Sequence, residues 1–254
     1  MTVVDGAYDQ DIKQEERGVG PLAGGILTQG YQCGQLWGAA LAAGAQAHRR
    51  LGPGPQAEAA AVAASQRLVA AFRRDYRHIN CSDLTELSWK DMQARQVVKY
   101  IATGRILHCF TMAGGYAQTT HREINAALDG PLPEAPEPPV SCASMLVRAM
   151  GGSELHQTMA AGFAGGIGLS GGGCGALGAA IWLISMQEIE DGGFKLNMES
   201  PRAQAVIERY LASADYEFEC ANVVGRQFAD LHDHAAHLRD GGCAQIIQAL
   251  AAAE

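Results

Sequence analysis

The sequence lacks the features that mark proteins which bind nucleic acid or cross membranes. It has no long run of Lys or Arg, and its formal net charge at pH 7 is −8, whereas nucleic acid and anionic membranes both require a basic surface. Its most apolar run, Ala176–Met186, is far shorter than the roughly 20 residues of a membrane-spanning helix. We therefore expect the chain to act on small molecules or on other proteins.

Strand patterns, in which apolar and polar residues alternate, are also scarce. Apolar residues are instead commonly spaced three or four apart, as on one face of a helix. In Gln56–Tyr76, for example, Val62, Leu68 and Phe72 have spacings that place them on one helical face. The sequence thus predicts an all-α fold. The other predicted helices are Met92–Ile101, Arg105–Leu128, Ala143–Met150, Leu155–Ala164, Ala176–Met186, Arg202–Ala212 and Ala244–Ala253.

A secretory signal is missing from the first residues, MTVVDGAYDQDIKQEERG, which have neither a basic start nor an unbroken apolar core. We expect the chain to stay in the cytoplasm. Seven cysteines in that reducing compartment do not predict a disulfide framework, and an odd number would leave one unpaired. Metal binding or redox chemistry is the hypothesis that they suggest. The alternative for any one of them is a small, apolar core residue.

The sequence contains an internal repeat. A shift of 141 residues places Ala23–Ala39 on Ala164–Ala180 without a gap, and nine of the 17 aligned positions are identical. Glycine and alanine inflate such a match, but cysteine is rare, and Cys33 falls on Cys174. Two copies of one helical module are therefore predicted, each a small bundle of about four or five helices.

The remaining cysteines extend the repeat. The spacings are 48 and 28 residues between Cys33, Cys81 and Cys109, and 46 and 23 residues between Cys174, Cys220 and Cys243. The seventh, Cys142, has no partner in the first copy. Proline-rich Asp129–Val140 cannot form a regular helix and favours an extended connection, so we predict a first copy at 1–128, a linker at 129–140 and a second copy at 141–254.

The glycine-rich segment Gly165–Gly178 contains a G-x-G-x-x-G pattern, but the predicted helix before it excludes the strand that a dinucleotide fold requires. The glycines fit better as close packing around Cys33 and Cys174. Each of these cysteines precedes a small, apolar helix, so its sulfur is predicted to lie at a helix N-terminus, where the thiol pKa should be lowered. The alternative is that the glycines only allow tight helix packing.

At these residues the chain resembles the bacterial and archaeal family named for its C_GCAxxG_C_C pattern, whose members are described as redox-active. The second copy carries the whole pattern, with Gly-Cys-Gly-Ala at its centre: Cys142, Gly173–Gly178, Cys220 and Cys243. The first copy is degenerate, since it lacks the leading cysteine and reads Gln32–Gly38, QCGQLWG, at the central motif. The resemblance implies a redox or metal role for the cysteines and says little about a substrate.

Four cysteines suffice for a tetrahedral thiolate site that holds an iron–sulfur cluster, zinc or Cu(I). No C-x₂-C spacing occurs, so helices distant in sequence would have to assemble the site. We favour iron–sulfur because the resemblance implies redox chemistry and zinc is not redox-active. The candidate metal ligands are Cys33, Cys81, Cys109, Cys142, Cys174, Cys220 and Cys243. The candidates for contact with the cofactor are Gly34, Trp37, Gly173 and Gly175.

The histidines of Asp230–His237, DLHDHAAH, form a second candidate ligand set, because His234 and His237 could share a helical face. The alternative, which we prefer, is a polar helix face in water, with His232 on it as well. Short motifs of this kind match by chance at a high rate.

Three kinds of function remain open. The first is a metal protein that passes electrons to a protein partner or reduces a small substrate. The second is a metal-free thiol/disulfide protein in which a low-pKa Cys174 or Cys33 attacks and another cysteine resolves the disulfide. The third is a non-catalytic module that carries a metal or cofactor. The sequence also allows the two copies to share one site across a pseudo-twofold interface, and it allows a homo-oligomer.

Overall fold

The structure is a computed structural model, and it describes residues 1–254 except 10, 88–104, 193–199 and 253–254. No strand forms among the described residues, which contain only two isolated β-bridges, so the all-α prediction is confirmed. No described helix is both long and apolar enough to cross a membrane. The helices are α1 (Thr2–Ala7), α2 (Lys13–Gly18), the 3₁₀ helix η1 (Gly20–Leu22), α3 (Gly34–Leu51), α4 (Pro55–Tyr76), α5 (Cys81–Thr85), α7 (Arg105–Leu128), α8 (Cys142–Ala149), α9 (Glu154–Ala161), α10 (Gly175–Glu190), α11 (Pro201–Ser213), α12 (Cys220–Val224), α13 (Leu231–Arg239) and α14 (Ala244–Ala251).

The predicted helices agree with the observed ones to within a few residues at each end. The long helix predicted from Arg105 to Leu128 is α7. Helix α9 ends at Ala161 rather than Ala164 because the chain then enters a turn of left-handed backbone that begins at Gly165. The helix predicted at Met92–Ile101 lies outside the described residues.

The two sequence copies fold into helices that follow one another in the same order. Helices α1, α2, α3, α4 and α5 of the first copy correspond in order to α8, α9, α10, α11 and α12 of the second. Helix α7 carries Cys109, and α14 begins directly after Cys243, so these two close the series. Helix α13 lies between α12 and α14 and has no described counterpart.

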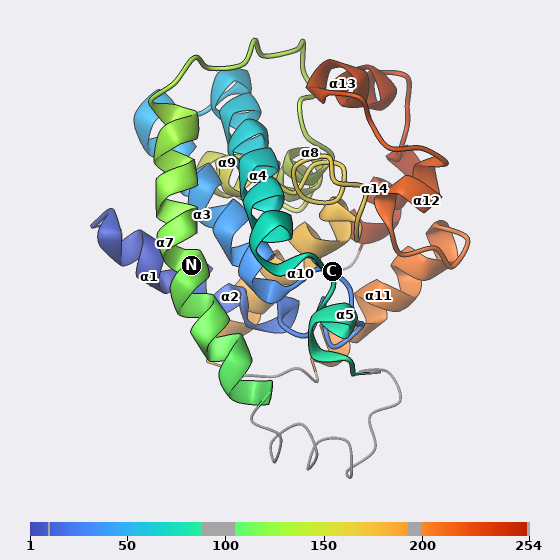
Figure 1. Ribbon diagram of the computed structural model, residues 1–254. Helices are drawn as coiled ribbons and strands as arrows, with labels where there is room; N and C mark the ends of the chain where they lie inside the picture. The colour runs from blue at the N-terminus through green and yellow to red at the C-terminus, as the bar shows by residue number, and fades with distance from the viewer. Residues whose placement is uncertain (10, 88–104, 193–199, 253–254) are drawn as a thin grey trace.

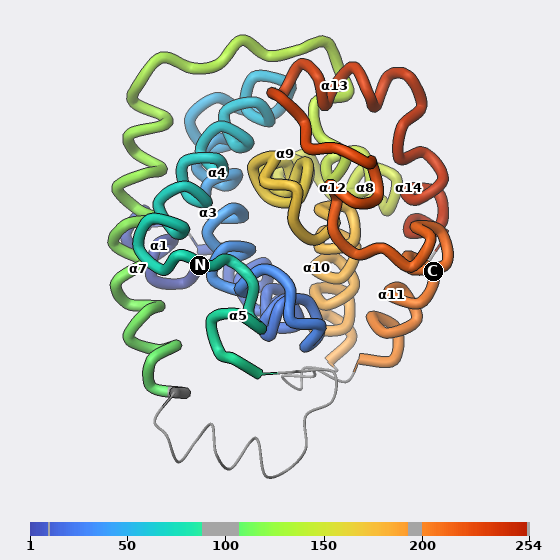
Figure 2. Tube along the Cα trace, turned by 45° about the vertical axis from the view of Figure 1, so that its right-hand side comes forward, coloured from blue at the N-terminus to red at the C-terminus, as the bar shows by residue number. Residues whose placement is uncertain are grey.

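The copies are interleaved. Helix α3 of the first copy packs on α9 of the second, and α10 of the second packs on α2 of the first. One large apolar cluster draws buried residues from both copies. In both views α7 lies on one side of the molecule and α11 and α14 on the other, while Asp129–Val140 runs without helix over the top (Figures 1 and 2).

The core helices of the two copies meet at a tryptophan and a glycine. The fully buried ring of Trp37 on α3 lies against Gly178 of α10, where a Cβ would overlap the ring. Phe163 packs edge-on against the same ring, with 4.7 Å between centroids, and the Trp37 Nε1–H donates to the Gln32 carbonyl at 3.2 Å. With the 141-residue shift, Trp37 and Gly178 are equivalent positions, so the contact marks a local pseudo-twofold axis.

This contact predicts that Gly178→Ala destabilises the protein by about 1–3 kcal/mol, since overpacking a core outweighs the gain in helix propensity. The measurement is the free energy of unfolding in denaturant. Gly114→Ala in α7 is the control, because a Cβ there meets no atom within 4 Å. If Gly178→Ala remained as costly in a Trp37→Leu background, the proposed overlap with the ring would be wrong.

Candidate functional site

A turn of left-handed backbone precedes the central cysteine of each copy. Ile26 has φ +63° and its equivalent Ile167 has φ +61°, a conformation that is unusual for a β-branched residue. The left-handed positions match pairwise between the copies: Gly24 and Gly165, Gly25 and Gly166, Ile26 and Ile167, Leu27 and Gly168, Thr28 and Leu169, Gly30 and Gly171. Because these positions repeat, the turn is a property of the module.

Backbone hydrogen bonds join this turn to the next cysteine of the same copy. In the second copy the Cys174 N–H donates to the Phe218 carbonyl at 3.1 Å. The Cys220 N–H donates to the Gly172 carbonyl at 2.7 Å. These bonds hold the backbones of Cys174 and Cys220 together, although 46 residues separate the two in sequence.

The first copy has the same two bonds. The Cys33 N–H donates to the Ile79 carbonyl at 2.8 Å, and the Cys81 N–H donates to the Tyr31 carbonyl at 2.7 Å. The similar spacings of the cysteines in the two copies therefore reflect one backbone arrangement.

All four cysteines of the second copy lie close enough together for their charges to interact. Burial raises the pKa of the Cys220 thiol, and Cys174, Cys142 and Cys243 raise it further. Burial likewise raises the pKa of Cys142, with Cys243 and Cys174 adding to it. The pKa of Cys243 is raised to about 12 by burial and by Cys174. Helices α8, α10, α12 and α14 thus bring their cysteines into one group.

Each of these four cysteines stands at the start of a helix. Cys142 and Cys220 are the first residues of α8 and α12, and Cys174 and Cys243 are the N-caps of α10 and α14. Backbone N–H groups act on two of the sulfurs in the direction that favours a thiolate: Gly165 and Ala143 at Cys142, and Leu177 and Ala176 at Cys174.

The predicted lowering of the thiol pKa at Cys33 and Cys174 is wrong. Burial raises the pKa of Cys33 to about 11 and raises that of Cys174 as well. The N–H groups at the helix starts do oppose this shift, as the sequence predicted, but removing the sulfur from water disfavours the thiolate by more. Without a metal, both are protonated thiols at neutral pH.

Tyr210 of α11 belongs to the same group, and no sequence pattern pointed to it. Its hydroxyl donates to the Phe218 carbonyl at 3.2 Å, and it also lies against the Cys174 sulfur, where it lowers the thiol pKa. Its own pKa is raised, chiefly by burial and then by the negative charge that Cys174 can carry. The Tyr210 hydroxyl therefore reaches both the Phe218 carbonyl and the Cys174 sulfur.

The first copy brings together a smaller set. Cys109 contributes to the raised pKa of Cys33, so these two are neighbours. The Gln35 Nε2–H₂ donates to the Cys109 carbonyl at 3.1 Å, which ties α3 to α7. The position equivalent to Cys142 is Met1. The first copy therefore has the equivalent helix, α1, with a methionine where α8 has its cysteine.

The four residues predicted to contact a cofactor are close to protein atoms. A Cβ at Gly175 would overlap the Phe163 carbonyl, and one at Gly34 would approach Ala23 to 3.0 Å. A Cβ at Gly173 would lie 2.9 Å from the Gln32 Oε1. Trp37 packs on the core helix of the other copy. These contacts fit the alternative of tight packing, and a cofactor role for the four residues remains a prediction.

The three histidines of α13 do not act as one set. His232 is exposed. The His234 Nδ1 lies 3.2 Å from the Val140 carbonyl, and burial lowers the pKa of His234 to about 4, so it is a neutral residue that ties α13 to the end of the linker. The His237 Nε2 lies 3.8 Å from the Cys243 Sγ. Only His237 therefore reaches the cysteines.

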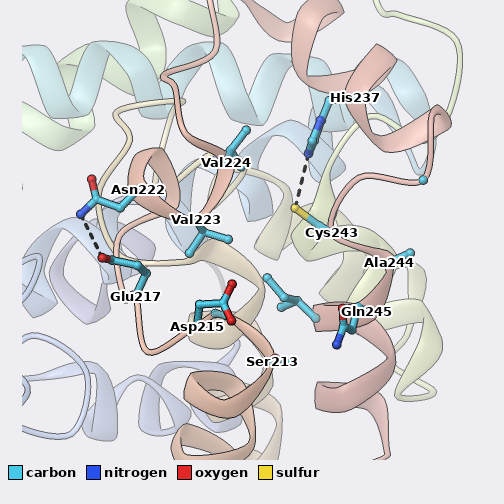
Figure 3. Close-up of a pocket in the computed structure, with 13 residues that line it drawn as sticks. Ser213, Asp215, Glu217, Asn222, Val223, Val224, His237, Cys243, Ala244 and Gln245 are labelled. Carbon is cyan, nitrogen blue, oxygen red and sulfur yellow. Dashed lines mark hydrogen bonds between the residues drawn. The ribbon is translucent and has the colours of Figure 1, made fainter.

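A pocket of about 460 Å³ opens beside Cys243 (Figure 3). Its walls come from the end of α11 and the residues after it, from α12, from His237 of α13 and from the segment that leads into the start of α14. Cys142, Cys174 and Cys220 are buried, whereas Cys243 is half-buried and lines the pocket. Cys243 is thus the member of the group that outside molecules can approach.

The donor set suits a soft metal centre, although the side chains do not converge on one point. In the part of the chain that the structure describes, no three His, Cys, Asp or Glu side chains are placed to hold a single metal ion. Three buried sulfurs and the half-buried sulfur of Cys243, with backbone N–H groups directed at Cys142 and Cys174, nevertheless match the chemistry of thiolate-bound metals. The seven predicted ligands remain predictions.

The model of one protein family matches most of the chain, over residues 2–122 and 140–253. Its description is "Putative redox-active protein (C_GCAxxG_C_C)". The chain belongs to this family. The family match recurs in two tandem copies, as the repeat predicted, and the C_GCAxxG_C_C description supports a redox role. No curated protein and no solved structure matches the chain.

The geometry predicts how the second-copy thiols of the reduced, metal-free protein react with iodoacetamide. Because each thiol pKa is raised, little thiolate exists at pH 7, and alkylation should rise about tenfold per pH unit up to the pKa. Half-buried Cys243 should react before Cys142, Cys174 and Cys220. Mass spectrometry of labelled peptides measures the order. Fast labelling of Cys174 at neutral pH would contradict the raised pKa of its thiol.

Proposed function

We propose that Cys142, Cys174, Cys220 and Cys243 hold an iron–sulfur cluster, and that the protein transfers electrons or reduces a small substrate. The observation that carries this proposal is that three buried cysteines and half-buried Cys243, each at the start of a helix, lie within reach of one another's charge. The family description adds the redox role.

The raised pKa values favour a metal over a metal-free thiol reaction. A buried thiol whose pKa is raised is a poor nucleophile, because the thiolate is the reactive form. A metal that binds the sulfur displaces the proton and supplies the positive charge that the buried site otherwise lacks. The same burial that opposes thiol chemistry is therefore compatible with thiolate ligation.

The protein surroundings would also stabilise the charge of a bound cluster. Backbone N–H groups of Gly165 and Ala143 face the Cys142 sulfur, and those of Leu177 and Ala176 face Cys174. Hydrogen bonds to cluster sulfurs and burial are the means by which proteins set the potential of such a centre. When bound, the cluster would supply one-electron redox chemistry. The chain's own part is to hold it, exclude water and leave Cys243 facing the pocket.

An anaerobic preparation tests the proposal. We expect iron and acid-labile sulfide in the purified protein, with visible absorption that bleaches on reduction. Cys220→Ser should abolish this absorption and the bound iron. Its matched control is Cys81→Ser, the equivalent change in the first copy, which should keep both.

Two results would contradict the proposal. Protein that contains neither iron nor sulfide, even after anaerobic reconstitution, would show that the cysteines hold no such cluster. Equal loss of iron in both serine variants would show that the centre draws on both copies, and the assignment to the second copy alone would be wrong.

One contact favours a second candidate function, a metal-free thiol/disulfide reaction. His237 beside half-buried Cys243 could take the thiol proton when Cys243 attacks a disulfide. A colourless protein whose Cys243 forms a disulfide with Cys142 or Cys174 on mild oxidation, and loses that reactivity in His237→Ala, would support it over the cluster.

A further inference from the structure

We propose that the pocket beside Cys243 admits small polar molecules that are neutral or positively charged to the cysteine group, and disfavours anions. This inference rests on the proposed function only in taking the cysteine group as the redox centre. It adds the site at which the other reactant binds and the charge class of that reactant.

The pocket has the size and position of a substrate site. Its volume of about 460 Å³ lies within the range of roughly 300–1,000 Å³ that is usual for small-molecule sites. Residues from four helical segments surround it, so it is formed by the tertiary structure. Among the four cysteines of the second copy, Cys243 is the one that lines it.

The Cys243 sulfur is held at the pocket wall. Cys243 itself has φ +62° and lies two residues after Gly241, which has φ +85°, so left-handed backbone places the cysteine at this wall. The His237 ring lies over Gly242, where a Cβ would overlap the ring, and its Nε2 lies 3.8 Å from the Cys243 Sγ. Figure 3 shows the imidazole pointing at the sulfur from the upper edge of the pocket.

Two carboxylates give the mouth of the pocket its charge. Asp215 and Glu217 are exposed and line it, and the Asn222 Nδ2–H₂ donates to the Glu217 Oε2 at 3.1 Å, which holds that carboxylate in place (Figure 3). Among the described residues of the lining, none is Lys or Arg. The other polar lining groups include Ser213 and Gln245, which are neutral.

The negative charge at the mouth of the pocket favours some reactants over others according to their own charge. Two carboxylates within a pocket act over distances comparable to the screening length of about 10 Å at 0.1 M salt, and low-dielectric walls strengthen their field. An anion would approach Cys243 against this field, whereas a cation or a neutral molecule with hydrogen-bond donors could bind the free carboxylate oxygens. The substrate class is therefore a neutral or cationic polar molecule.

Two redox reagents of opposite charge test the inference. The anaerobically reduced protein is mixed with hexaammineruthenium(III) or with ferricyanide at low ionic strength, and stopped-flow absorbance gives each rate constant. One electron leaves the cysteine-held centre and reduces Ru(III) to Ru(II), or the ferric iron of ferricyanide to ferrous. The double variant Asp215→Asn with Glu217→Gln should lower the rate constant for reduction of the cation roughly fivefold and raise the rate constant for reduction of the anion by a similar factor.

A matched control separates the pocket from the overall negative charge. Asp83→Asn with Glu134→Gln makes the same change in net charge at two exposed residues outside the pocket, and it should change either rate less than about twofold. Equal effects of the two double variants, or no effect of the pocket variant, would overturn the inference.

A protein without a redox centre would give no electron transfer to either reagent in any variant, which is the failure of the proposed function. The pocket is then tested on the thiol itself. The Cys243 thiolate attacks the sulfenyl sulfur of a methanethiosulfonate reagent, so that a mixed disulfide forms and methanesulfinate leaves. A trimethylammonium reagent should label Cys243 faster than a sulfonate reagent. Loss of this preference in Asp215→Asn with Glu217→Gln supports the inference, and its persistence there overturns it.

Discussion

The left-handed turn ahead of each central cysteine is the constraint on which the arrangement of the cysteines depends. Left-handed backbone costs about 1–2 kcal/mol per non-glycine residue, so the surrounding structure must hold it. Hydrogen bonds across the turn do so at equivalent places, from the Leu27 N–H to the Pro21 carbonyl and from the Gly168 N–H to the Gly162 carbonyl. The turn leads within three residues to the N-cap cysteine. It also fixes the backbone carbonyl that accepts the hydrogen bond from the N–H of the next cysteine.

The copies differ where their turns meet, and this difference explains the degenerate motif of the first copy. The Gln32 Nε2–H₂ donates to the Gly166 carbonyl at 2.7 Å, and the side chain occupies the space where a Cβ on Gly172 would lie. Tyr31 stacks on Phe218 of the other copy, with 3.9 Å between centroids and 2° between planes. Since Tyr31 and Gln32 align with Gly172 and Gly173, large residues in one copy fill the room that glycines leave in the other.

The sequence predicted what depends on local spacing and missed what depends on packing between distant segments. Apolar periodicity located α4 because one face of that helix is buried. The register of Cys33 with Cys174 located the repeat. The thiol pKa was predicted in the wrong direction because a helix N-terminus is visible in the sequence, whereas the burial that raises the pKa comes from the packing of segments that are distant in sequence. The interleaving of the copies was not predicted either, because α3 and α10 are buried along most of their length and their sequences do not say which helices lie against them.

The two copies also differ in the charge of one buried residue on their first helices, α1 and α8. Where the second copy has Leu146, the first has Asp5, and both side chains are fully buried. Burial raises the pKa of the Asp5 carboxyl to about 7, so near neutral pH this position carries part of a negative charge in a region of low dielectric constant. Because Met1 stands where the second copy has Cys142, the first copy offers one thiolate fewer than the centre that we assign to the second.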